Sequence, residues 1–241
     1  MAQFDEQHLR ARAQSSAMID EGLRSYMLKV YNYMSIGLGI TGVVAFFFYR
    51  YTTSNPEIFA LVYQSPLMWV IALSPLAFIL VLSFGINKMS AATAQLTFWA
   101  FATVMGLSLS SIFITYTGVS IAKVFFITAA TFGAMSLYGY TTKRDLTGMG
   151  SFLFMGLIGI IIASVVNMFI GSGMLDFAIS VIGVLIFVGL TAYDTQKIKE
   201  EYLESDGAEI MGKKAIMGAL RLYLDFINLF LMLLRLFGNR N

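Results

Sequence analysis

Seven apolar segments, each close to the length of a membrane-spanning helix, constrain the fold more than any other feature of this sequence. About 20 apolar residues are needed to cross a hydrocarbon core of about 30 Å as a helix. Connections such as residues 171–173 are short, so we expect neighbouring segments to form antiparallel helical hairpins. The segments cover residues 30–49, 67–86, 96–116, 121–140, 151–170, 177–194 and 215–236.

The composition agrees with membrane insertion. Hydrophobic residues make up 58% of the 241 residues and charged residues only 12%, whereas charged residues make up about 25% of soluble domains. Such a chain cannot cover a water-facing surface. We therefore predict an all-α integral membrane protein, a seven-transmembrane helix bundle in which residues 30–241 form a single domain. Residues 1–29 are predicted to be a polar cytosolic N-terminal tail.

The basic residues predict the orientation, because cytosolic loops are enriched in Lys and Arg. One side of the predicted bundle carries few of them, namely Arg50, Lys123, Arg235 and Arg240. The N-terminal side, predicted to be cytosolic, carries most of the others, which are Arg10, Arg12, Arg24, Lys29, Lys88, Lys143, Arg144, Lys197, Lys199, Lys213 and Lys214.

Several chemistries are disfavoured by the residues that the chain lacks. It has no Cys, and its one His, His8, lies in the polar tail, so neither a His-based zinc site nor a Ser-His-Asp triad is available. The basic residues flank the spans instead of clustering, which argues against a nucleic-acid partner. An intramembrane aspartyl protease would carry a Gly-x-Gly-Asp pattern, which is absent. We predict that the protein is not an enzyme and holds no tightly bound cofactor.

The last segment carries a polar stripe. Arg221, Asp225, Asn228, Met232 and Arg235 recur at the spacing of one helix face. A carboxylate at the bilayer centre costs about 2.5–3.5 kcal/mol, so its face must point to protein or water. The seventh helix is therefore expected to be central, surrounded by the other six. Two alternatives stay open: Arg221 and Asp225 form a purely structural ion pair, or this segment is re-entrant.

A second acid, Asp194, ends the sixth segment. One interpretation is a solvated acid paired with Lys197 or Lys199. The other is a pair with Asp225, in which two carboxyl groups cannot both ionise freely and titrate as a unit. Such a pair could hold its two helices together in a closed state when it shares a proton, and give an open state when both acids are ionised and repel each other. Its oxygens also suit Ca²⁺. The two acids can meet only if the seventh helix starts late, near residues 214–220.

Three motifs closely resemble the bacterial branch of the transmembrane Bax inhibitor motif (Bax inhibitor-1) family. They are SLYGYTTKRDL at 136–146, AYDTQKI at 192–198 and LYLDFINLF at 222–230, and the likeness covers nearly the whole chain after Arg24. The resemblance implies seven helices around a central seventh and a pH-sensitive Ca²⁺ leak with a di-aspartyl sensor. Asp194 and Asp225 occupy the sensor positions. In place of the Arg-rich end of the second helix found in some members, this chain has Lys88, which lacks a bidentate fork.

The leading functional prediction is a pH-sensitive calcium leak channel of the bacterial inner membrane. Asp194 and Asp225 would form both the sensor and the calcium path, supported by Arg221, Asn228 and Lys88. Lipid, Ca²⁺ and protons are its expected partners. The alternative is a non-conducting interaction protein that modulates a membrane-bound AAA protease or a stress response, with the N-terminal tail as its handle.

Overall fold

The computed structural model describes the backbone of residues 2–241 and the side chains of residues 20–241. Over the described backbone the chain is helical, without β-strands beyond one isolated bridge. The side chains of residues 1–19, including His8, lie outside the described residues. The helices are α1 (Ala2–Thr53), α2 (Pro56–Tyr63), α3 (Leu67–Gly85), η1 (Ile86–Lys88), α4 (Ala91–Leu109), α5 (Ile112–Thr115), α6 (Gly118–Thr141), α7 (Thr147–Ile170), α8 (Gly173–Glu200) and α9 (Ala208–Phe237).

The seven predicted spans are confirmed as seven helical stretches that are long and apolar enough to cross a membrane. They correspond to α1, α3 with η1, α4 with α5, α6, α7, α8 and α9. Helix α9 is one uninterrupted helix of 30 residues, so the re-entrant alternative for the last segment is wrong. The chain is an all-α membrane helix bundle.

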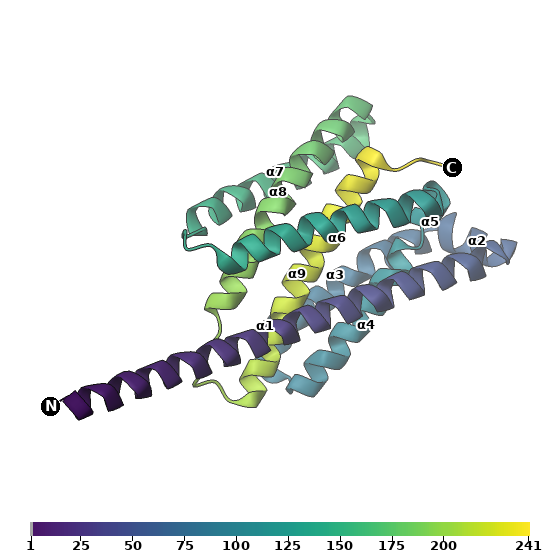
Figure 1. The fold of residues 1–241 in the computed structure, drawn as a ribbon. Helices are drawn as coiled ribbons and strands as arrows, with labels where there is room; N and C mark the ends of the chain where they lie inside the picture. The colour runs from purple at the N-terminus through teal and green to yellow at the C-terminus, as the bar shows by residue number, and fades with distance from the viewer. Residues whose placement is uncertain (1) are drawn as a thin grey trace.

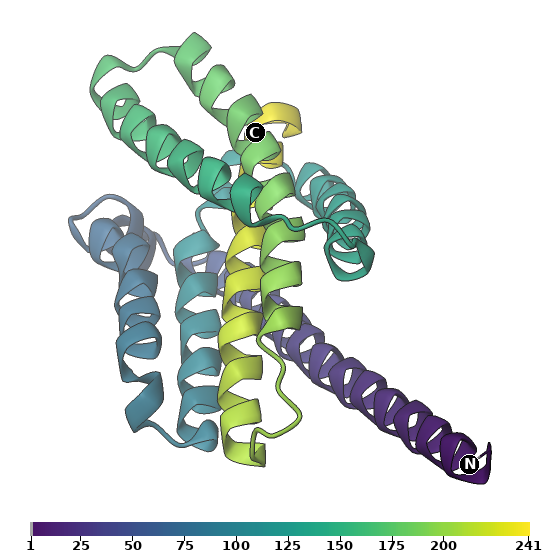
Figure 2. The same ribbon diagram turned by 90° about the vertical axis from the view of Figure 1, so that its left-hand side faces the viewer.

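Helix α9 lies at the centre of this bundle (Figures 1 and 2). Of its most apolar stretch, 67% is buried, compared with 11% in α3 and in α7. It packs against α1, α4, α6 and α8. The expectation that all six other helices surround α9 needs correction, because α3 packs mainly on α4 and α7 mainly on α8. Four helices are enough to enclose a single central one.

Helix boundaries differ from the prediction where hydropathy gives no signal. Helix α1 runs unbroken across residues 29 and 30, so the predicted boundary between tail and span coincides with no helix end. The third predicted segment is divided between α4 and α5 at Ser110 and Ser111. The Ser110 hydroxyl donates to the Leu107 carbonyl at 2.6 Å, and such local side-chain bonds compete with helical ones.

The α7–α8 hairpin shows how tight connections are made. Gly171 ends α7 with a positive φ of 67°, a conformation that favours glycine. The Ser172 hydroxyl then accepts from the backbone N–H of Leu175 and caps α8. Asn167 Oδ1 accepts from the Ser172 N–H at 3.0 Å. The two helices are thereby fixed as antiparallel neighbours.

The C-terminus is held at the opposite end of the bundle from the N-terminus (Figure 1). The Thr117 N–H donates to the Asn239 carbonyl at 3.0 Å, and the Asn241 N–H donates to the Thr115 carbonyl at 3.0 Å. The last residues therefore cover the α5–α6 connection.

Seven crossings and the asymmetry of basic residues predict an N-terminus in the cytosol and a C-terminus outside it. A reporter that is active only in the periplasm should give a signal when it is fused after Asn241. A reporter that is active only in the cytosol should give a signal when it is fused before Met1. A cytosolic signal from the C-terminal fusion would contradict this topology.

Candidate functional site

Asp194 of α8 and Asp225 of α9 lie together in the interior of the bundle. Their carboxyl groups are within hydrogen-bonding reach of each other. Asp225 is only 5% exposed, while Asp194 is half-buried. No hydrogen-bond donor among the described residues reaches Asp225 Oδ2, which is fully buried. The structure therefore brings together the two acids that the sequence singled out; we call them the aspartate pair.

The two acids meet by a different route from the expected one. Helix α9 does not start late but at Ala208, so about 26 Å of helix precedes Asp225, whereas only about 9 Å of α8 follows Asp194. The loop 201–207 makes up the difference by running along the side of α9 before that helix begins (Figure 2). Because the start of α9 is polar and extends past α8, hydropathy alone placed its beginning too late.

Glycines bring the backbones around the aspartate pair close together. A Cβ atom on Gly139 of α6 would overlap the carbonyl group of Ala192, two residues before Asp194 on α8. On α9, a Cβ atom at Gly218 would lie 3.0 Å from Ile198 Cγ2 of α8. These close approaches fix α8 between α6 and α9 and so set the position of Asp194.

Arg221 binds Glu201, not Asp225. Its Nη1 atom lies 2.6 Å from Glu201 Oε1, so the structural ion pair with Asp225 that the sequence left open is wrong. The Arg221 charge still acts on both acids of the aspartate pair through space. Sequence reasoning missed Glu201, because a loop residue has no periodic relation to the stripe on α9.

Neither lysine near Asp194 in sequence binds it. Lys197 Nζ pairs with Glu200 at 2.8 Å, and Lys199 Nζ donates to the Tyr140 carbonyl at 2.8 Å. The interpretation of Asp194 as a solvated acid paired with one of them is therefore wrong. Lys88 ends η1 and is exposed. Within residues 20–241 no ion pair connects it to either acid.

Gln196, which the sequence analysis did not single out, attaches the α6–α7 loop to α8. Its Oε1 accepts from the Leu146 N–H at 2.9 Å and its Nε2 donates to the Arg144 carbonyl at 2.8 Å. Within that loop, bonds from the Thr147 hydroxyl and backbone N–H lower the pKa of Asp145 below its ordinary value. An ionised, exposed acid thus lies beside the buried site without belonging to it.

The α8–α9 loop closes the N-terminal side of the site. Lys214 Nζ bonds to Asp206 Oδ2 at 2.5 Å and to the Glu201 carbonyl at 2.8 Å. The rings of Tyr26 on α1 and Tyr202 in the loop are 5.7 Å apart. Together with the bond from Arg221 to Glu201, these contacts hold the loop over this end of the aspartate pair.

A cavity of about 570 Å³ opens on the other side, toward the end that holds the C-terminus. We call it the outer cavity. Asn228, Met232 and Arg235 of the α9 stripe line it, together with residues of α7 and α8. At its rim Arg235 Nη1 lies 3.7 Å from Asp176 Oδ1. Asn228 donates to the Leu224 carbonyl at 2.8 Å and lies about 4.5 Å of helix rise from Asp225.

The sequence left open an ion pair between Arg221 and Asp225, whereas the structure predicts that Arg221 is energetically coupled to Glu201. Both side chains are about one-third exposed or more, at 41% and 34%, so we expect a coupling energy of only about 1 kcal/mol. In a double-mutant cycle in detergent, Arg221→Ala and Glu201→Ala should couple by that amount. Stronger coupling of Arg221→Ala to Asp225→Asn than to Glu201→Ala would contradict this pairing.

Comparison with known proteins identifies the relatives of this chain. The family model described as "Inhibitor of apoptosis-promoting Bax1" matches residues 23–241. The inner membrane protein YbhL of Escherichia coli K12 is 48% identical over 95% of this chain and 97% of its own length. The uncharacterized protein RP147 of Rickettsia prowazekii is 53% identical over 92% of both chains. An uncharacterized membrane protein of Streptococcus pyogenes is 39% identical over 92% of this chain and 96% of its own.

Proposed function

We propose that this chain, which belongs to the Bax inhibitor-1 family of membrane proteins, is a pH-sensitive calcium leak channel of the bacterial inner membrane. The observation that carries the proposal is the aspartate pair, two carboxyl groups on neighbouring helices in the interior of the bundle. Ionisable groups inside a membrane bundle are costly and typically mark an ion or proton pathway.

The proton sensitivity follows from the hydrogen bonding of the pair. Buried polar atoms are normally paired, yet Asp225 Oδ2 has no donor among the described residues. A single proton held between the two carboxyl groups supplies a donor and removes the repulsion between two adjacent anions. We infer that the protonated pair holds α8 against α9. When the proton leaves, two negative charges face each other and favour separation of the helices.

Arg221 acts through space on both acids of this pair, and Glu201 acts on Asp194. Arg221 favours the ionised pair, but its bond to Glu201 offsets part of its positive charge. The local balance between one cation and three acids makes a second negative charge at the pair unfavourable. The proton-dependent step is therefore assigned to Asp194 and Asp225 acting as a unit.

The ion path proposed here follows the polar stripe of α9. A cation would enter the outer cavity past Asp176, reach Asn228, and meet the aspartate pair one helix turn deeper. Carboxylate and amide oxygens are ligands that Ca²⁺ prefers. The loop 201–207, bound through Glu201 and Lys214, blocks the cytosolic exit. Opening requires that α8 and this loop move away from α9.

Calcium flux in proteoliposomes tests the proposal. Purified protein in vesicles loaded with a calcium indicator should leak Ca²⁺ without any partner, and the leak should increase with rising pH as the aspartate pair loses its proton. Vesicles containing heat-denatured protein serve as the control. A leak equal to the control at every pH, or one that decreases with rising pH, would contradict the proposal.

A non-conducting interaction protein is the second candidate, and one observation favours it. The N-terminal part of α1 continues as a helix beyond the rest of the bundle (Figures 1 and 2). A protruding cytosolic helix could bind a membrane-bound protease. This candidate predicts that deleting residues 2–19 abolishes the effect of the protein on the protease in cells. It also predicts that vesicles with the purified full-length protein stay impermeable to Ca²⁺ at every pH.

A further inference from the structure

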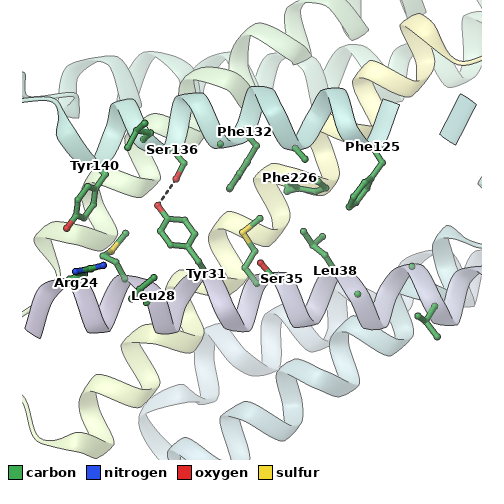
Figure 3. Close-up of a pocket in the computed structure, with 18 residues that line it drawn as sticks. Arg24, Leu28, Tyr31, Ser35, Leu38, Phe125, Phe132, Ser136, Tyr140 and Phe226 are labelled. Atoms are coloured by element: carbon green, nitrogen blue, oxygen red, sulfur yellow. Dashed lines mark hydrogen bonds between the residues drawn. The ribbon is translucent and has the colours of Figure 1, made fainter. Parts of the chain in front are cut away.

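A long groove lies between α1 and α6 (Figure 3). Residues of α7 and α8 line the outer cavity instead. The volume of the groove is about 960 Å³, larger than that of the outer cavity. Phe125 and Phe132 of α6 and Phe226 of α9 pack against each other along it. The groove thus reaches from the lipid-facing surface of the bundle to its central helix.

The groove has the dimensions and lining of a site for a hydrocarbon chain. Along α1 it extends from Arg24 to Val43, about 28 Å of helix rise, which exceeds the thickness of one leaflet of a hydrocarbon core of about 30 Å. Gly39 and Gly133 line opposite walls, and a Cβ atom on either would meet open space. Most of the lining residues are apolar, and the space between the walls is open.

The hydroxyls that cross the middle of the groove bond to one another. The hydroxyls of Tyr31 and Ser136 are 2.6 Å apart, and the hydroxyls of Ser136 and Thr195 are 3.0 Å apart. Thr195 donates onward to the Thr191 carbonyl at 2.7 Å. This chain of bonds crosses from α1 through α6 to α8, so the hydroxyls of Tyr31, Ser136 and Thr195 are all paired. An apolar occupant can pass it without loss of a hydrogen bond.

Positive charge is concentrated where the groove meets the N-terminal side of the membrane. Arg24 and Tyr140 form its end (Figure 3), and Lys199 Nζ lies 5.2 Å from the centre of the Tyr140 ring. Arg24 is exposed, and no acid within residues 20–241 forms an ion pair with it. A guanidinium at this depth is suited to bind a phosphate group.

We propose that the α1–α6 groove binds one anionic phospholipid from the leaflet on the N-terminal side, with an acyl chain between the helices and its phosphate on Arg24. The apolar walls exclude water. A neutral headgroup gains less than an anionic one from the two cations, Arg24 and Lys199. This inference does not depend on calcium conduction. It implies that the lipid contacts Phe226, the residue next to Asp225.

Native mass spectrometry of the full-length protein in detergent tests the site. The protein is titrated with phosphatidylglycerol and, separately, with phosphatidylcholine of the same acyl chains. Wild-type protein should retain one phosphatidylglycerol more tightly than phosphatidylcholine. Arg24→Gln should weaken phosphatidylglycerol binding by about fivefold, the effect of one cation near an anionic headgroup. Lys143→Gln, which removes an exposed cation outside the groove, should change nothing.

A second pair of variants tests the acyl-chain position. Gly39→Leu together with Gly133→Leu fills the groove and should weaken binding of both lipids by about tenfold, the effect of losing one or two buried methylene contacts. Gly159→Leu on α7, where a Cβ atom also meets open space, is the matched control and should bind lipid normally.

Three results would overturn the proposal: normal lipid retention in the filled variant, an unchanged preference for phosphatidylglycerol in Arg24→Gln, or loss of a protein dimer instead of a lipid on filling. The last result would make the groove a contact between two copies of the chain. Thermal unfolding of each variant in detergent verifies that it is folded before its lipid binding is compared.

Discussion

Replacing Asp225 with asparagine should flatten the pH dependence of calcium leak. Asparagine keeps the shape of the side chain but cannot ionise, so the repulsion that separates α8 from α9 is lost. Asp194→Asn should flatten the profile in the same way. The measurement is Ca²⁺ flux in proteoliposomes made with equal amounts of each variant.

The two substitutions should differ in the level of the leak. Asp194 is half-buried and nearer the closing loop, so losing its contact is expected to raise the basal leak. Asp225 is buried on the central helix, and its loss as a calcium ligand is expected to lower the flux. Asp145→Asn is the matched control, because this exposed acid has a lowered pKa and stays ionised at the pH values used for the flux measurement. A wild-type pH profile in either pair variant would rule out the aspartate pair as the sensor.

Gly139→Leu should cause the largest loss of stability. A side chain there would overlap the Ala192 carbonyl group of α8, and backbone cannot move aside as a flexible side chain can. We expect a loss of about 3 kcal/mol or more in the free energy of unfolding, read as a lower unfolding temperature in detergent or as absence of folded protein.

Gly133→Leu on the same helix is the control for that experiment, because a Cβ atom there meets open space. It should unfold close to the wild-type temperature. If both variants were equally stable, α6 and α8 would not approach each other as closely as the structure has them. The position of Asp194, two residues from Ala192, would then need revision.

The seven spans and the aspartate pair were predictable because a membrane imposes strong rules on the sequence. Backbone polar groups must be satisfied within helices, so each span appears as a continuous apolar segment. A carboxylate in such a segment needs an interior partner, which is why Asp225 predicted a central α9. The family motifs around Asp194 and Asp225 pointed to the same two residues.

The parts that could not be predicted lie where the apolar pattern stops. Helix α9 begins at Ala208, in a polar stretch that hydropathy cannot distinguish from a loop. Glu201, the partner of Arg221, belongs to a loop whose path is set by tertiary contacts such as Lys214 with Asp206. The division of α4 from α5 depends on hydroxyl bonds of Ser110. None of these contacts leaves a periodic trace in the sequence.

Infrared difference spectroscopy on the proteoliposomes used for flux would test the central claim most directly, because it reports the proton on a carboxyl group. We expect the band of a protonated carboxyl to disappear as pH rises, with the same midpoint as the increase in calcium leak. Asp194→Asn and Asp225→Asn should each remove the transition at that midpoint, because the remaining carboxyl group then titrates alone. A calcium leak that changes with pH while no carboxyl of the aspartate pair changes protonation would contradict it.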